Sequence, residues 1–196
     1  MKIENIHCEN SSDNSLWDNY QARLLGDLKG QVFHLTSQDA FNLIQVSEAI
    51  EHNKDGRFKL ITASEKSFGR LMGWVCLFDL RHATPELITD TLNSYNFFLP
   101  PGDLGREISN VLAYLILDST YFDRLIPYEL HNNHVRKTGQ YPMAIPKVET
   151  WIADKVPLTW IKKVILASIG EILTEEQIQR RQGINEAYRN LKWGQD

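Results

Sequence analysis

The stretch that decides the predicted fold is DLGREISNVLAYLIL, residues 103–117. Its apolar residues recur at intervals of three and four over three turns: Leu104, Ile108, Val111, Leu112, Leu115 and Ile116. That spacing is typical of an amphipathic helix with one face against a core. Asp103 can cap such a helix, and the Pro-Pro-Gly run before it ends the preceding segment. We therefore predict that residues 103–117 form the main core helix, with Leu112 and Leu115 inside the core.

Helix signals continue on both sides of this stretch. Thr84-Pro85-Glu86 is the clearest helix start, with a capping hydroxyl, a proline in the first turn and an acid at the positive helix end. Other helical patterns lie over residues 15–28, 37–50, 64–81, 147–155, 158–173 and 174–191. The sequence thus predicts a mainly α protein, a compact multi-helix bundle or a short stack of helix pairs. At most two or three short strands are expected near the N-terminal third.

Length and composition predict a single domain. The chain has 196 residues, of which 42% are hydrophobic and 23% charged, as in an ordinary globular domain. Residues 1–14 are polar, so we expect a flexible lead-in before one helical domain at 15–196. No apolar run approaches the ~18 residues of a membrane span, and the first residues lack the features of a secretory signal. We expect a cytoplasmic protein without membrane contact.

Charge is unevenly distributed along the chain. Residues 1–56 contain nine acids and four bases, whereas the whole chain has a net charge of −4. The pI is near 5.9. A nucleic-acid-binding protein usually has a basic stripe and a high pI, so the balance argues against nucleic acid as the main partner.

No arrangement for nucleophilic, phosphate or dinucleotide chemistry stands out. The chain has no Gly-x-Ser-x-Gly elbow, Walker loop or dinucleotide fingerprint. His131 and His134 could share a helix face toward a metal, but only Glu129 nearby could add a ligand. We expect two solvated histidines in a long polar connection, residues 128–146, of the kind that is often functional. The sequence predicts no metal, no cofactor and no catalytic residue.

Arg124 and His131 support an enzymatic alternative. Their order and spacing resemble the arginine and histidine of the HEPN ribonucleases, a family of helical proteins. The resemblance implies metal-independent RNA cleavage, with Arg124 and His131 meeting at a dimer interface. Pro127 departs from the pattern, because the family has a helix there and a proline costs about 3 kcal/mol in a helix interior.

By elimination, the sequence favours a non-catalytic protein that binds another protein: an inhibitor, an immunity protein or an adaptor. An acidic face suits a basic partner such as a nuclease toxin, because opposite fields speed the encounter. A second alternative is an accessory subunit of a nucleic-acid or phage-defence complex. That subunit would use the cations of the C-terminal half: Arg136, Lys137, Lys162, Lys163, Arg180 and Arg181.

Overall fold

The computed structural model describes residues 1–9, 13–58, 66–95, 97–100, 102–103 and 108–170. They form a mixed α/β fold around a six-stranded sheet with the order β1-β10-β7-β2-β4-β8. Its strands are β1 (Lys2–Cys8), β2 (Val32–Ser37), β4 (Trp74–Asp79), β7 (Val111–Leu117), β8 (Glu149–Ala153) and β10 (Ile161–Ile169). Neighbouring strands are antiparallel except β1 and β10, which are parallel. Two small sheets pair β3 (Ala49–Glu51) with β9 (Lys155–Pro157) and β5 (Gly102–Asp103) with β6 (Ile108–Ser109).

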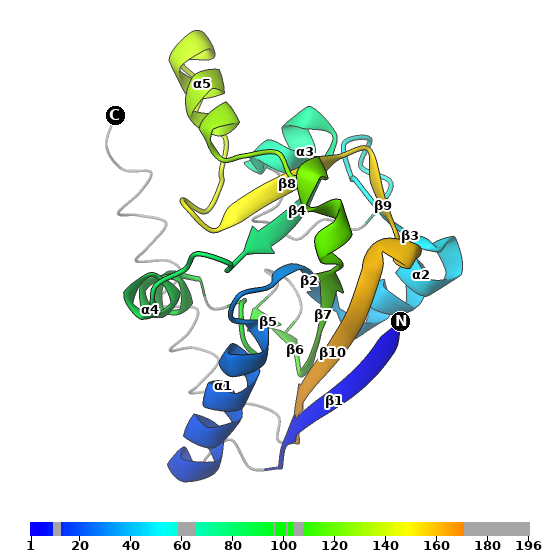
Figure 1. Ribbon diagram of the computed structural model, residues 1–196, viewed down its shortest axis with the longest axis vertical. Coiled ribbons are helices and arrows are strands. Elements are labelled where there is room, and N and C mark those ends of the chain that lie inside the picture. Colours follow the sequence, from blue (N-terminus) through cyan, green and yellow to red (C-terminus); the bar gives the residue numbers. More distant parts are fainter. Residues whose placement is uncertain (10–12, 59–65, 96, 101, 104–107, 171–196) are drawn as a thin grey trace.

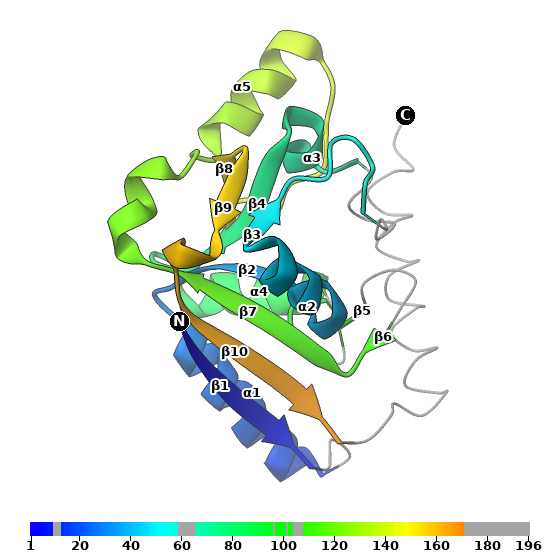
Figure 2. The ribbon, with the colours of Figure 1, turned by 90° about the vertical axis from the view of Figure 1, so that its right-hand side faces the viewer.

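Helices cover both faces of the sheet (Figures 1 and 2). On one face lie α1 (Asn14–Leu28) and α4 (Pro85–Ser94), and Leu24 of α1 joins a core cluster with Phe33 of β2. On the other face lie α2 (Gln38–Ser47) and the β3–β9 pair, and Phe41 of α2 joins a second cluster with Leu115 of β7. Beside β4 and β8 lie α3 (Phe68–Met72) and α5 (Glu129–Thr138). The short 3-10 helices η2 (Ser119–Arg124) and η3 (Leu158–Trp160) complete the described part.

The prediction of a mainly α bundle is wrong, and β7 shows why. Residues 111–117 are seven consecutive apolar residues, six of them buried, in an inner strand of the sheet. A strand buried on both faces does not alternate between apolar and polar residues. Its continuous apolar residues therefore match the period of a helix as well as that of a strand. Leu112 and Leu115 are fully buried, as predicted. They lie on opposite faces of the sheet, however, in separate core clusters.

Three other predicted helices are wrong for a related reason. The apolar residues of segment 158–173 belong mainly to β10, which pairs with β7 across seven residue positions. Segment 147–155 contains β8 and the start of β9. In the described part of segment 64–81, residues 66–81, only residues 68–72 are α-helical before β4 begins. The predicted final helix at 174–191 lies outside the described residues. Residues 2–8, expected in a flexible lead-in, form β1, which is buried at Ile6 and Cys8.

The helices predicted to begin at Thr84 and near Ser37 are confirmed, whereas the helix predicted to begin at Asp103 is not. Thr84 caps α4, where its side chain accepts a hydrogen bond from the Leu87 backbone N–H at 3.2 Å. Ser37 caps α2 in the same way, through the Ala40 backbone N–H. α1 is also present, but its cap is Asp13, which accepts from the N–H groups of residues 15 and 16. A capping hydrogen bond joins residues only two or three positions apart. The start of these helices could therefore be predicted from the local sequence.

The sheet forks between β2 and β4. Their ladder covers only two pairs, Val32 with Asp79 and Phe33 with Phe78, before β2 continues along β7 and β4 along β8. Beyond the ladder, the His34 side chain bridges the strands, because its Nδ1 donates to the Cys76 carbonyl oxygen at 2.9 Å. A carbonyl can only accept, so Nδ1 carries the proton. Burial lowers the pKa of His34 and favours this neutral ring.

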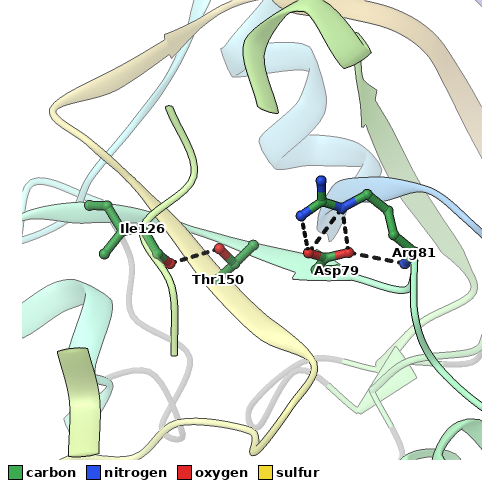
Figure 3. Close-up of polar contacts among 4 residues, drawn as sticks. All are labelled: Asp79, Arg81, Ile126 and Thr150. Atoms are coloured by element: carbon green, nitrogen blue, oxygen red, sulfur yellow. Dashed lines mark hydrogen bonds and ion pairs between the residues drawn. The ribbon is translucent and has the colours of Figure 1, made fainter. Parts of the chain in front are cut away.

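Polar contacts hold the segments around β4 and β8 (Figure 3). Asp79 at the end of β4 binds Arg81 through both carboxylate oxygens, and the Arg81 guanidinium lies 4.5 Å from the centroid of the Phe122 ring in η2. The hydroxyl of Thr150 donates to the Ile126 carbonyl oxygen at 2.8 Å, and the Ile126 N–H donates to the Trp151 carbonyl at 2.7 Å. The segment after η2 is therefore fastened along β8, at that edge of the sheet.

Candidate functional site

The structure separates the environments of Arg124 and His131. Arg124 ends η2 with a side chain 65% exposed, and its Nε lies 3.9 Å from Asp123. His131 is buried in α5, and its Nε2 donates to the Pro142 carbonyl oxygen at 2.8 Å. The mixed α/β fold also differs from the helical fold that the HEPN resemblance implies. The hydrogen bond of His131 to Pro142 therefore has a structural role. The geometry does not support an Arg124–His131 catalytic pair.

We expected two solvated histidines. His131 is only 8% exposed, so the expectation is wrong for that residue, and His134 is half-buried and thus only partly in contact with solvent. Both rings pack against Phe68 of α3, with centroid distances of 5.1 Å and 5.4 Å. Phe68 also contacts Trp151 of β8 at 5.0 Å, so the histidines belong to an aromatic cluster. Within the described residues, no group of three or more His, Cys, Asp or Glu side chains gathers as a metal site would require.

Glu149 is a buried carboxylate beside this cluster. Its Oε1 accepts from the Trp151 Nε1–H and its Oε2 from the Ile145 N–H, both at 2.9 Å. Burial raises the pKa of Glu149, and these donors oppose the shift. Burial also raises the pKa of the Cys76 thiol, and the Glu149 charge adds to that effect. Cys76 is thus held as a weakly nucleophilic thiol, and Glu149 anchors Trp151 and the turn at Ile145.

The solvent face of α2 is the most exposed apolar surface on a described helix. Val46 is 84% exposed and Leu43 is 63% exposed, three residues apart, while Phe41 and Ile44 anchor the other face. The apolar spacing of residues 37–50 predicts an amphipathic helix with all four in one apolar stripe. At roughly 100° per residue, Leu43 lies about 200° from Phe41, so the angular spread could have revealed two faces.

Two acids and no base lie on α2 together with the exposed pair. Asp39 lies in the first turn and Glu48 caps the C-terminal end, and both are exposed. The sequence contains no lysine or arginine between Lys29 and Lys54. We call Asp39, Leu43, Val46 and Glu48 the α2 surface. It combines two exposed apolar side chains with an exposed acid toward each end of the helix.

A second feature is a hollow of about 450 Å³ between α3 and residues 140–142. Three of the described residues that line it are cations. The described lining consists of Lys54, Lys66, Ser67, Arg70, Leu71, Gln140, Tyr141 and Pro142. The polar connection singled out in the sequence contributes the last three of these residues. Sequence spacing could not have found the hollow, because its walls come from three segments that only the fold brings together.

The cations proposed for a nucleic-acid or defence complex lie on separate elements. Arg136 and Lys137 are exposed at the end of α5, and Lys162 is exposed on β10. Lys163 is engaged in ion pairs, with its Nζ 3.0 Å from Glu4 and 3.7 Å from Asp27. Arg180 and Arg181 lie outside the described residues.

In the part of the chain that the structure describes, no helix is long and apolar enough to cross a membrane. No protein-family model, no curated protein and no solved structure matches this chain.

Proposed function

We propose that this protein acts by binding another protein, without turnover, and that the α2 surface is part of the interface. The exposure of Val46 and Leu43 on a helix already anchored by its opposite face supports the proposal. Fully burying a side chain of this size contributes about 1.5–3 kcal/mol, so two such residues could form the centre of an interface. The exposed side chains of Leu43 and Val46 do not hold α2 in place, because Phe41 and Ile44 on its other face are buried in the core.

The two exposed acids of the α2 surface indicate the kind of partner. Asp39 and Glu48 are exposed, whereas Glu51 is already paired with Arg57 at 3.2 Å. A partner with lysines or arginines around an apolar pocket would meet both parts of the α2 surface. Its association should slow as salt rises, because screening shortens the field to about 8 Å at physiological ionic strength. An inhibitor, an immunity protein or an adaptor could each work in this way.

A site-specific crosslinking experiment tests the proposal. A photoreactive residue at position 46 in the host should crosslink one protein, which can then be purified for kinetics. Leu43→Ser and Val46→Ser should raise the dissociation rate of that partner. Asp39→Asn and Glu48→Gln should mainly slow association, with a smaller effect at high salt.

Leu16→Ser is the matched control. Leu16 is 47% exposed on α1, which packs on the opposite face of the sheet, so its replacement should leave binding unchanged. Equal losses from Leu16→Ser and Val46→Ser would contradict a role for the α2 surface. RNA cleavage by the purified protein, abolished by Arg124→Ala or His131→Ala, would instead favour the HEPN-like alternative.

A further inference from the structure

The two outer edges of the six-stranded sheet differ in their protection. At the β8 edge, the segment after η2 bridges to the strand, because the Ile126 N–H donates to the Trp151 carbonyl oxygen at 2.7 Å. The other edge is β1, whose ladder in the described part of the chain is to β10 alone. Figure 1 shows β1 at the margin of the molecule, with no other coloured element beyond it. An unpaired strand edge is a template for another strand.

The ladder to β10 determines which backbone groups of β1 face outward. The Gly170 N–H donates to the Cys8 carbonyl oxygen at 2.8 Å, so the backbone of Cys8 faces β10. Successive residues of a strand direct their N–H and C=O groups to opposite sides, so Ile3, Asn5 and His7 direct theirs away from β10. These outward groups have no partner among the described residues, and the three side chains are exposed.

The β1 strand has few of the features that keep an exposed edge from pairing. Its ladder to β10 runs from Lys2 to Cys8 without a bulge, and the strand contains no proline. Its one acid, Glu4, is already paired with Lys163 of β10 at 3.0 Å. Ile3 adds an apolar side chain that is 44% exposed. A regular edge with so little free charge favours pairing with another strand.

A second copy of the chain fits this edge. When two β1 strands meet antiparallel about a two-fold axis at Asn5, Asn5 faces the partner's Asn5 and Ile3 faces the partner's His7. The outward residues then form three hydrogen-bonded pairs, which exchange about six backbone bonds. No like charges oppose each other in this register. A shift that places Ile3 against the partner's Asn5 would bring Glu4 against the partner's Glu4, which is unfavourable.

We propose that the chain forms a two-fold dimer in which the β1 strands pair antiparallel about Asn5 and join the two sheets into one. Each copy uses its own β1 edge, so the interface is closed and assembly stops at two copies. The β1 strand contains no residue of the α2 surface. The dimer therefore goes beyond the proposed function, and dimer formation and partner binding are measured separately.

Sedimentation velocity of the full-length protein tests the dimer. Monomers should convert to dimers over a concentration range of about 1–100 μM. Asn5→Pro removes an outward N–H at the axis and no bond to β10, so it should weaken the dimer about tenfold or more. Ile3→Lys places a charge at the edge and should have a similar effect. Leu130→Lys is the matched control, because Leu130 is 42% exposed on α5 and its replacement should leave the dimer unchanged.

Disulfide trapping tests the register. The Cα atoms of a hydrogen-bonded antiparallel pair lie about 5.5 Å apart, within the range that a disulfide spans. Asn5→Cys should therefore give a disulfide-linked dimer under mild oxidation. His7→Cys is the control on the same edge, because the two copies of position 7 would lie about 13 Å or more apart. The unsubstituted protein, with Cys8 and Cys76, gives the background.

Three results would overturn this dimer. A monomer at every concentration up to about 500 μM would show that a second copy does not cover the edge. A dimer that withstands both Asn5→Pro and Ile3→Lys, or that Leu130→Lys weakens equally, would form through another surface or respond only to net charge. Trapping at position 7 and not at position 5 would contradict the register. Unchanged urea midpoints would confirm that the variants remain folded.

Discussion

Replacing Gly69 by alanine should disrupt the contact between α3 and β8. A Cβ atom at Gly69 would lie 2.7 Å from Cδ1 and 2.9 Å from Nε1 of Trp151, and 3.3 Å from the Trp74 carbonyl oxygen. Non-bonded carbon atoms usually approach to about 3.5–4.0 Å, so the indole would have to move by roughly 0.8 Å. The close approach of helix and strand therefore depends on the missing side chain.

Trp151 has little room to move. Its side chain is fully buried, packs against Phe68 and Tyr128, and donates to Glu149 through Nε1. Overpacking of this kind costs about 1–3 kcal/mol. A weakened hydrogen bond to Glu149 would add to that loss, because the carboxylate is buried. Alanine favours a helix over glycine by about 1 kcal/mol, which offsets part of the cost. We expect a net loss of about 1–3 kcal/mol in the free energy of unfolding.

Urea denaturation followed by tryptophan fluorescence and circular dichroism measures this loss. Gly26→Ala is the matched control, because Gly26 lies in α1 and a Cβ there would meet nothing within 4 Å. That control should stabilise the protein by about 0.5–1 kcal/mol. If Gly69→Ala were as stable as the original protein, or more so, the Trp151 contact would not limit the approach of α3.

Three further substitutions test the fold. Leu112→Ala should lower the free energy of unfolding by about 2–5 kcal/mol in urea, because Leu112 is fully buried in β7; a loss below about 1 kcal/mol would contradict its place in the core. Thr84→Ala removes the cap of α4 and should cost about 0.5–2 kcal/mol in the same assay, whereas Thr84→Ser should cost less. Burial lowers the pKa of His34, so its contribution to stability is complete above about pH 6.5 and is lost as the pH falls through the folded-state pKa. His34→Asn keeps a donor for the Cys76 carbonyl without this titration, so denaturation at pH 7 and pH 5 should show a smaller difference in the variant; an unchanged difference would assign the pH dependence to other groups.

The exposed apolar pair on α2 and the hollow beside α3 were only partly predictable from the sequence. The acidic character of the N-terminal third was evident, and the structure shows that part of it surrounds Leu43 and Val46. Helical spacing separates Leu43 from Phe41, but which of the two faces packs on the sheet required the fold, because five apolar residues in ten leave the buried arc ambiguous. The cationic hollow could not have been predicted, since Lys54, Arg70 and Tyr141 are far apart in the chain.

Local chemistry alone determined where α2 and α4 begin and that Leu112 and Leu115 lie in the core. Ser37 and Thr84 accept hydrogen bonds from backbone N–H groups three residues later, and such signals do not depend on distant parts of the chain. Tertiary structure decided that residues 111–117 form a strand. Seven apolar residues satisfy a helix or a buried strand equally, and β7 is stabilised by ladders to β2 and β10. Those partners lie tens of residues away, on either side in the sequence, and they convert an ambiguous apolar run into an inner strand buried on both faces.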